Sequence, residues 1–478
     1  MEVLYIILAA LVVFIAVLLI RAAAFRPQKE EPVVAEPEQF DREKAVRDLQ
    51  ALIRCKTVSY RDRALEDDAE FDKLYALLPE LFPNVYKTCE LTQLTDRSLL
   101  FHWKGKSAAQ PGVLMAHYDV VPVNEDQWEK PAFDAIIEDG VRGGRGTLDT
   151  KGTFLGVLEA ADNLMGMGFV PANDLYLAFA GNEEVSGDGA PATVRWFEQQ
   201  GIRPAFVLDE GGAVVEGVFP GVTEACAVVG IAEKGPMDVT FTLSSAGGHA
   251  STPPPHTSVG LLARAVQRVE DHPFPFRLTA PASQMFDTLG RRSTFLYRMI
   301  FANLWCFAPV LNLICKKSGG ELNALVRTTV AFTQMQGSAA SNVLPPNAWV
   351  GANLRLMGDE TVESAKVYLE KTIADERIRV DVVEGMNPSP VSRTDGEPWQ
   401  RLCTAIRATW DGVVVTPYLM LACSDSRHYG RISEHVYRFS AMALSKQERG
   451  MIHANNERVP LETVEKTVAF YQRLIRAC

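Results

Sequence analysis

The sequence lacks several features that would mark a nucleic-acid-binding or disulfide-rich protein. Its eight cysteines form no C-x-x-C pair, which disfavours both a zinc knuckle and a dense disulfide framework. No basic run is interleaved with aromatic residues, and the net charge of -11 argues against a nucleic-acid partner. No N-x-S/T sequon with x other than proline occurs, which is mildly against a glycosylated lumenal protein. The remaining composition, 47% hydrophobic and 22% charged over 478 residues, is that of a globular protein with two or three domains.

A long apolar run lies at the N-terminus. Val3 to Ile20 are uncharged and almost wholly apolar, which is just enough to span a bilayer as a helix. No Lys or Arg precedes this run, and it exceeds a usual signal-peptide core, so a single-pass membrane anchor over residues 1–25 is favoured. The small residues that follow keep a cleaved signal peptide open as the alternative. Arg21, Arg26 and Lys29 come next, and the positive-inside rule would place the main body in the cytoplasm.

The pattern of the folded body predicts an α/β protein. Residues 26–40 are rich in Pro and Glu and predict a semi-rigid tether, after which Asp41 caps a predicted helix. From 112 to 230, short apolar runs alternate with helical patterns, which is typical of βαβ units and a mainly parallel sheet. Ligands of such sheets gather at the carboxyl ends of the strands.

Polar side chains stand where these predicted strands end. They are His117 and Asp119 in "LMAHYDVVPV", Asp149 in a glycine-rich turn, Glu183 and Glu184 in "GNEE", and Asp209 in "LDEGG". Taken alone, His117 and Asp119 favour a histidine that is hydrogen-bonded to a nearby carboxylate over a metal site. Several carboxylates converging on one cleft would repel one another, however, and metal cations are the natural compensation. Oxygen and imidazole ligands suit zinc, or else manganese or cobalt, and "GMIHANN" supplies His453 as a second imidazole.

Six motifs carry a resemblance to a known family. They are "HYDVVPV", "GRGTLDTKG", "GNEEVSG", "LDEGG", "SSAGGHASTPP" and "MIHANNE", and they follow one another between about residues 40 and 478. Together they resemble the dinuclear zinc hydrolases that include aminoacylases and carboxypeptidase G-type enzymes. In overall layout the chain is most similar to the Gly-X carboxypeptidases (carboxypeptidase S) and their N-acyl-amino-acid hydrolase relatives.

The resemblance implies a site with two zinc ions. His117 and Asp209 would hold one ion, Glu184 and His453 the other, and Asp149 would bridge both. A cis peptide bond is expected directly after Asp149.

The resemblance also assigns the groups around the metals. Asp119 would orient the His117 ring by accepting its other N–H. Glu183 would be the general base that takes a proton from the attacking water and passes it to the leaving amine. Glu183 and Glu184 would face opposite ways on a strand, so a local bend must bring both to the site.

A second domain, residues 233–390, is expected to interrupt the catalytic domain, which comprises 41–232 and 391–478. Its predicted elements follow the order β-α-β-β-α-β of a ferredoxin-like fold. By resemblance this domain is a lid through which the chain can form a homodimer. Within it, His249 would polarise the scissile carbonyl, reaching the partner's site in dimeric relatives.

Three further residues match substrate-binding positions. Asn342 and Arg355 would contact substrate from the lid. Arg427 would bind the substrate α-carboxylate, a task that suits the planar fork of a guanidinium group. Each arginine could instead serve a structural salt bridge.

The lid carries an apolar insertion at about 275–325. Polar residues and a proline interrupt the run from Phe295 to Cys315, which disfavours a second membrane span. A buried or amphipathic helix, an apolar wall for an acyl group, and a surface resting on the bilayer all stay open.

The sequence therefore predicts a membrane-anchored metallohydrolase that releases a C-terminal amino acid from a short peptide or N-acyl amino acid. A dipeptidase or aminoacylase is the alternative within the family. A non-catalytic binding protein on the same scaffold is the alternative from another class. It is disfavoured because the sequence keeps every predicted metal ligand and Glu183.

Overall fold

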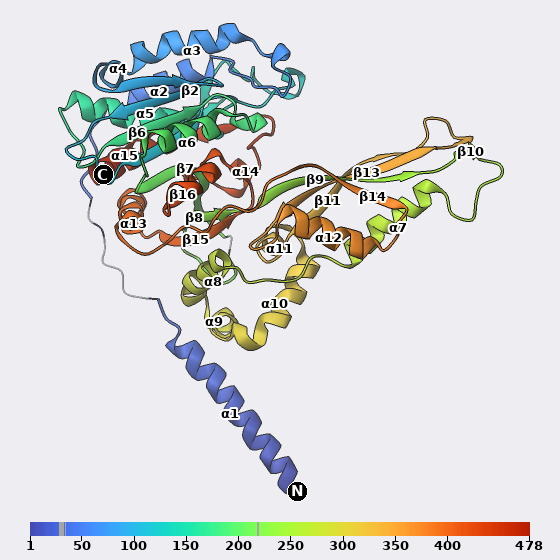
Figure 1. Ribbon diagram of the computed structural model, residues 1–478. Helices are drawn as coiled ribbons and strands as arrows, with labels where there is room; N and C mark the ends of the chain where they lie inside the picture. The colour runs from blue at the N-terminus through green and yellow to red at the C-terminus, as the bar shows by residue number, and fades with distance from the viewer. Residues whose placement is uncertain (28–32, 34, 218) are drawn as a thin grey trace.

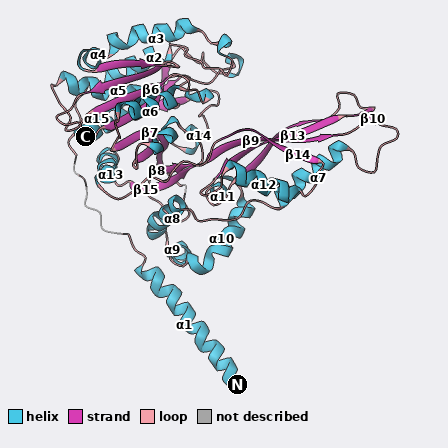
Figure 2. Ribbon diagram, in the orientation of Figure 1, coloured by secondary structure: helices cyan, strands magenta, loops and turns pink. Residues whose placement is uncertain are grey.

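The computed structural model describes residues 1–27, 33, 35–217 and 219–478 (Figure 1). Figure 2 shows a main body of strands between helices, an elongated second sheet extending from it, and a helical group from which α1 projects. Part of the predicted tether, residues 28–32 and 34, lies outside the described residues.

The main body is built on a mixed, mostly parallel sheet. Among the described residues it has eight strands. In spatial order they are β1 (Glu90–Leu94), β2 (Ser98–Trp103), β6 (Leu175–Ala180), β3 (Gly112–His117), β7 (Phe206–Val215), β16 (Val436–Ala443), β8 (Cys226–Glu233) and β15 (Val414–Met420). The central neighbours β6, β3, β7 and β16 run parallel, whereas β1 and β2 form an antiparallel edge.

Strand β3 shows why this sheet is buried on both faces. Its alternate residues point to opposite sides, so Leu114 and Ala116 enter one core while Val113 and Met115 enter another. An uninterrupted apolar run, rather than alternation with polar residues, is what a strand between two helical layers requires. The "GVLMAH" run, one of the apolar runs predicted to be strands, forms β3, and all six of its residues are buried.

Helices cover both faces of the main sheet. The larger core is closed by α2 (Arg42–Ile53), α3 (Asp68–Leu81), α4 (Pro83–Thr88), α5 (Lys151–Gly166), α13 (Glu397–Thr409) and α15 (Leu461–Arg476). The smaller core, on the other face, is closed by α6 (Gly189–Gln200) and the 3-10 helix η4 (Asp425–Arg431). Asp41 caps α2 as predicted, accepting a hydrogen bond from the Lys44 amide at 2.9 Å.

The second sheet is antiparallel and has its own core. Its strands, in spatial order, are β11 (Thr329–Gln336), β13 (Asn347–Leu356), β9 (Gly235–Ser244) and β14 (Ile378–Gly385). Helices α7 (Ser258–Asp271) and α12 (Val362–Ile373) pack against one face of it, so the chain order is β-α-β-β-α-β. At its far end, β10 (Gly248–His249) pairs with β12 (Val343–Leu344).

Four helices fill the apolar insertion between α7 and β11. They are α8 (Ala280–Arg292), α9 (Phe295–Phe301), α10 (Leu304–Ser318) and α11 (Gly320–Ala324). They share a core with residues at or near both ends of β8 and of β15, and Phe25 packs against this core. The helical group thus joins the main body to the N-terminal segment.

Helix α1 (Glu2–Ala24) is mostly exposed. Among the described residues it is the single helix that could cross a membrane by length and composition, as an anchor or as a signal sequence. Helices α9 and α10 meet the same criterion only as a pair, and they are bent by 106°.

The remaining elements are short. They are β4 (Ile137–Glu138), β5 (Val141–Gly143), β17 (Arg458–Pro460), α14 (Lys446–Arg449), η1 (Arg63–Leu65), η2 (Glu125–Gln127) and η3 (Glu183–Val185).

Candidate metal centre

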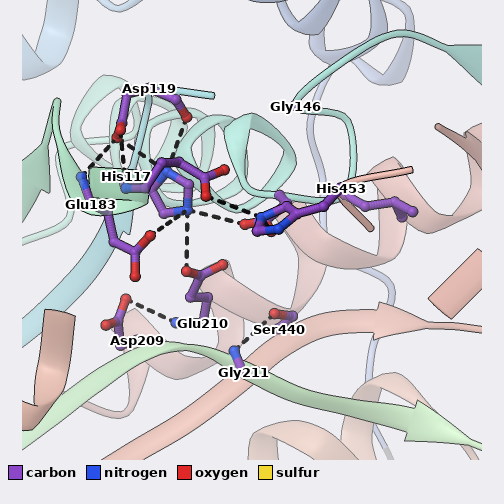
Figure 3. Close-up of polar contacts among 12 residues, drawn as sticks. His117, Asp119, Gly146, Glu183, Asp209, Glu210, Gly211, Ser440 and His453 are labelled. Carbon is purple, nitrogen blue, oxygen red and sulfur yellow. Dashed lines mark hydrogen bonds and ion pairs between the residues drawn. The ribbon is translucent and has the colours of Figure 1, made fainter. Parts of the chain in front are cut away.

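The polar strand ends of the main sheet do meet. Strands β6, β3 and β7 are immediate neighbours, so residues at or beyond their carboxyl ends share one edge. His117 ends β3, the Glu183–Glu184 pair follows β6, and Glu210 lies within β7. Figure 3 shows His117, Glu183 and Glu210 pointing toward one another, with His453 approaching from the C-terminal segment.

The Asp149 carboxylate lies between the two histidines. Its Oδ1 is 3.0 Å from His117 Nε2, and its Oδ2 is 2.9 Å from His453 Nε2. One oxygen thus faces each imidazole, which is the arrangement of a bridging ligand. The peptide bond between Asp149 and Thr150 is cis, as expected from the resemblance.

Each histidine also meets one glutamate. Glu184 Oε2 is 3.0 Å from His453 Nε2, on the side of Asp149 Oδ2. Glu210 Oε1 is 3.1 Å from His117 Nε2, on the side of Asp149 Oδ1. The cluster therefore has two halves, each with an imidazole, a glutamate and one oxygen of the shared aspartate.

The structure differs from the sequence prediction at Asp209. The predicted ligand turns its carboxylate to backbone amides instead: Oδ1 accepts from Glu210 N and Oδ2 from Ser426 N, both at 2.9 Å. Its neighbour Glu210 holds the place beside His117. Both carboxylates stand in the same "LDEGG" motif, so the correction is a shift of one residue.

Asp119 builds the bend that the Glu183–Glu184 pair needs. Its Oδ1 accepts the amide of Glu183 and its Oδ2 the amide of Glu184, each at 3.1 Å. These bonds hold the two residues in the 3-10 helix η3, where successive side chains no longer alternate as on a strand. His117 Nδ1 lies 3.0 Å from the Asp119 carbonyl oxygen and 3.3 Å from its Oδ1, so one buried residue orients both the ring and the two glutamates.

Glu457 is a residue that sequence reasoning missed. It is buried, pairs with Arg145 at 2.8 Å, and accepts the amides of Gly146 and Leu148 at 3.1 and 2.6 Å. It therefore fixes the turn that presents Asp149. Its position four residues after His453 in "HANNE" was the available signal.

Burial and charge together shift the pKa values of the cluster. Burial opposes the charged form of His117, but Glu210 and the other nearby carboxylates outweigh it and hold the pKa of His117 well above its usual value. Burial, opposed by His117, raises the pKa of Glu210 to about 8. Burial, opposed by His117 and reinforced by Asp425, raises the pKa of Glu183 well above its usual value. The cluster has more carboxylates than cations and so favours added positive charge.

The residues present fit divalent metal ions. Two groups of three residues offer ligand atoms that lie within 4.8 Å of one another, and both groups include His117. The first adds Asp149 and Glu184, and the second adds Glu183 and Glu210. Glu184 Oε1 is buried, and no hydrogen-bond partner for it occurs in the described part of the chain. A cation can satisfy a buried carboxylate oxygen that has no donor, and imidazole with carboxylate is a donor set typical of zinc and its neighbours.

A pocket beside this cluster contains both predicted arginines. Arg355 and Arg427 line it together with Glu183, Glu184 and His453. Arg355 Nη1 donates to Cys423 Sγ at 3.3 Å, placing the end of β13 against the main body.

The surroundings of Arg427 leave part of its guanidinium group unused. Arg427 Nη2 donates to the Asn387 carbonyl at 2.8 Å, and Nη1 lies 3.7 Å from Glu233 Oε2. Nη1 is buried without a hydrogen-bond partner among the described residues.

His249 and Asn342 lie elsewhere. Both are exposed at the tip formed by β10 and β12, where the Asn342 carbonyl accepts the Ala250 amide at 2.9 Å. His249 Nδ1 contacts Ser251 Oγ at 2.7 Å, and neither residue lines the pocket of the cluster. In Figure 1 this tip is the end of the second sheet farthest from the main body.

Comparison with curated proteins finds similarity along nearly the whole chain. It is 36% identical to the N-fatty-acyl-amino acid synthase/hydrolase PM20D1 of Xenopus tropicalis, over 98% of this chain and 93% of that one. It is 31% identical to the probable carboxypeptidase S-like 2 of Dictyostelium discoideum, over 98% of this chain and 92% of that one.

Solved structures share the fold at low sequence identity. The metallo-carboxypeptidase Sso-CP2 of Sulfolobus solfataricus aligns with a TM-score of 0.67 at 14% identity, covering 90% of this chain and 98% of that one. Human carnosine dipeptidase 1 aligns with a TM-score of 0.63 at 12% identity, covering 91% and 96%. The model of peptidase family M20/M25/M40 matches residues 113–477, a range that includes every residue of the cluster. The chain therefore belongs to peptidase family M20/M25/M40 and is a hydrolytic enzyme.

Proposed function

We propose that this protein is a dinuclear metal amidohydrolase that releases a C-terminal amino acid from short peptides or N-acyl amino acids. The observation that carries the proposal is the Asp149 carboxylate, with one oxygen on each of two histidines and a glutamate completing each half. The names of its relatives, one an N-fatty-acyl-amino acid synthase/hydrolase and one a probable carboxypeptidase, support an amide substrate with a free carboxylate.

The proposed ligand set follows the two halves of the cluster. His117 and Glu210 would hold one ion, His453 and Glu184 the other, and Asp149 both. Zinc fits this donor set, and cobalt or manganese are the alternatives. Metal ions at such a site supply Lewis acidity, which polarises a carbonyl and makes water more acidic.

The chain's own groups account for the proton transfers. Glu183 lines the pocket next to the ligands, and Glu183 Oε2 lies 3.9 Å from His117 Nε2. Its carboxylate can accept a proton from the water that attacks the amide carbon, and can give it to the nitrogen as the C–N bond breaks. Asp119 positions this base through the amide hydrogen bonds described above.

Arg427 is proposed to bind the substrate carboxylate. Arg427 Nη1 lies 3.7 Å from Glu233 Oε2 and makes no hydrogen bond in the described part of the chain, so the guanidinium group can donate to a carboxylate without losing a hydrogen bond to the protein. Arg355, in the same pocket, would add positive charge from the second sheet. A dipeptidase or aminoacylase would use the same catalytic groups, so the remaining pocket walls decide between these activities.

His249 and Asn342 are proposed to act on a second copy of the chain. Within one chain they lie at the exposed tip, apart from the pocket. A homodimer in which the second sheet acts as a lid over the partner's cluster would bring His249 to the scissile carbonyl as an oxyanion donor.

Helix α1 is proposed to be a retained membrane anchor rather than a cleaved signal sequence. Its small residue Ala22 is fully buried against the insertion helices, so removal of α1 would expose apolar surface.

The proposed function is tested by assaying Glu183→Gln and Glu184→Gln beside the wild type. Hydrolysis of N-acyl amino acids and short peptides by the metal-loaded protein is expected. Glu183→Gln cannot take a proton, so it should keep its metal and lose about 10²–10⁴-fold in kcat. Glu184→Gln should first lose metal and only as a consequence activity. Metal loss from Glu183→Gln with retention in Glu184→Gln would mean that the two roles are exchanged.

A further inference from the structure

Helices α9 and α10 form an exposed apolar platform. Their inward residues Phe301, Leu311 and Cys315 pack into the core of the helical group. Their outward residues remain exposed: Phe295, Leu296, Tyr297, Trp305, Val310, Leu313 and Ile314. Trp305 is 61% exposed, which is unusual for the largest apolar side chain. We call residues 295–318 the platform.

Helix α1 docks on this platform in a fixed register. The Asn303 side chain donates to the Leu18 carbonyl at 3.1 Å, and Arg21 Nη2 donates to the Ala302 carbonyl at 3.0 Å. One turn further into the helix, the Phe14 and Trp305 rings meet edge to face at 6.0 Å. Leu18 is one of the two buried residues of an otherwise exposed helix.

The register fixes how deep the platform must lie if α1 spans a bilayer. The apolar run of α1 ends at Ile20, directly before Arg21. A helix rises 1.5 Å per residue, so Phe14 lies about 9 Å inside that end. Trp305 is in contact with Phe14 and therefore reaches a similar depth. The start of α10 cannot stay in water while α1 occupies the hydrocarbon.

The charge of the platform fits the same surroundings. Residues 295–318 contain Arg298, Lys316 and Lys317 and no acidic residue. The two lysines are exposed at the end of α10. Basic residues beside an apolar helix face are attracted to the headgroups of anionic lipids, and tryptophan favours the boundary between headgroups and acyl chains.

From this register and charge we infer that the platform is a membrane-embedded foot, inserted into one leaflet of an anionic bilayer beside α1. The inference rests on the proposed anchoring by α1 and adds a second lipid contact to it. Helix α10 then lies at the interface rather than crossing the membrane, as its 106° bend from α9 allows. The foot would hold the helical group, and with it the main body, at a fixed height above the bilayer.

The test uses the full chain reconstituted into vesicles of phosphatidylcholine and phosphatidylglycerol, with and without a lipid carrying a nitroxide in its acyl chain. Tryptophan emission is compared among the wild type, Trp305→Phe and the matched control Trp349→Phe on β13. The nitroxide lipid should quench a component of wild-type emission that disappears in Trp305→Phe and persists in Trp349→Phe. Equal quenching in all three proteins would overturn the inference.

A second pair of variants probes the far end of the foot. In the Trp305→Phe background, Leu313→Trp on α10 is compared with Val383→Trp on β14, another exposed apolar position. Leu313→Trp should lose most of its added emission to the nitroxide lipid, and Val383→Trp should lose none. Protection of Leu313→Trp from aqueous acrylamide without nitroxide quenching would mean that a second protein copy covers the face, which contradicts a lipid contact.

Carbonate extraction separates failure of the foot from failure of the anchor. Full chain released from vesicles by carbonate would refute the anchoring by α1, and the foot with it. Full chain retained in the vesicles without quenching at positions 305 and 313 would refute the foot alone.

Discussion

The metal cluster and the tip of the second sheet both contain residues predicted for one reaction, yet their surroundings are opposite. Asp119 and His117 are buried, and each makes several polar contacts with neighbours on different elements. His249 is exposed on a two-residue strand and contacts Ser251, two residues away. A catalytic group that acts within its own chain is held in position by polar contacts with several elements. The His249 side chain has a polar contact only with a nearby residue of its own loop in the described part of the chain, which is consistent with a group that acts on another chain.

Removal of the Asp149 carboxylate is the strongest test of the candidate metal centre. Asp149→Ala should lose both metal ions and at least about three decades of activity, because each ion supplies several kcal/mol of charge stabilisation. Asp149→Asn is the matched variant, which keeps the side-chain size and should retain part of the metal. Elemental analysis and kcat measure both effects, and two tightly bound ions in Asp149→Ala would contradict the bridging role.

The tip is tested by complementation between chains. His249→Ala should lose about 10²–10³-fold in kcat, the usual effect of removing an oxyanion donor, while its melting temperature stays unchanged. A mixture of His249→Ala and Glu183→Gln chains should regain about a quarter of wild-type activity, since half of the dimers would contain one complete site. Unchanged activity of His249→Ala alone, or no recovery on mixing, would show that the tip does not serve a partner.

A smaller effect is expected in the pocket of Arg427, which the near end of the second sheet lines together with the main body. Arg427→Lys keeps the positive charge but loses the planar guanidinium group that can make two hydrogen bonds to a carboxylate. The kcat/KM for substrates with a free carboxylate should therefore fall about 10–100-fold. Substrates with an amidated C-terminus should be equally poor for the variant and the wild type. Arg431→Lys, at an exposed ion pair with Glu198, is the control and should change nothing. Equal use of free and amidated substrates by the wild type would refute carboxylate recognition.

The parts predicted from sequence are those with strong local signals. Helix α7, the first helix of the predicted β-α-β-β-α-β order, forms because the apolar residues of "SVGLLARAVQRVED" recur with the helical period. His117 and the Glu183–Glu184 pair come together because apolar runs precede them on neighbouring strands.

The choice between Asp209 and Glu210 could not be made from the sequence. Alternation would decide it only on a regular strand, and β7 is irregular at this point. Arg438 of β16 pairs with Asp209, whereas the next residue, Phe439, pairs with Gly212. Glu210 and Gly211, which lie between Asp209 and Gly212 on β7, therefore form a bulge, and a bulge changes the direction of side chains. The two glycines of "DEGG" permit such a bulge, but the residue at which it falls depends on pairing with the neighbouring strand.

Metal content of the Asp209→Asn and Glu210→Gln variants shows which of these two neighbouring carboxylates holds an ion. Glu210→Gln removes a charged oxygen beside His117 and should retain about one ion per chain instead of two. Asp209→Asn changes a group that accepts two backbone amides and should keep both ions. Elemental analysis of both variants beside the wild type gives the answer. Loss of an ion from Asp209→Asn with two ions retained in Glu210→Gln would contradict the ligand set proposed for this centre.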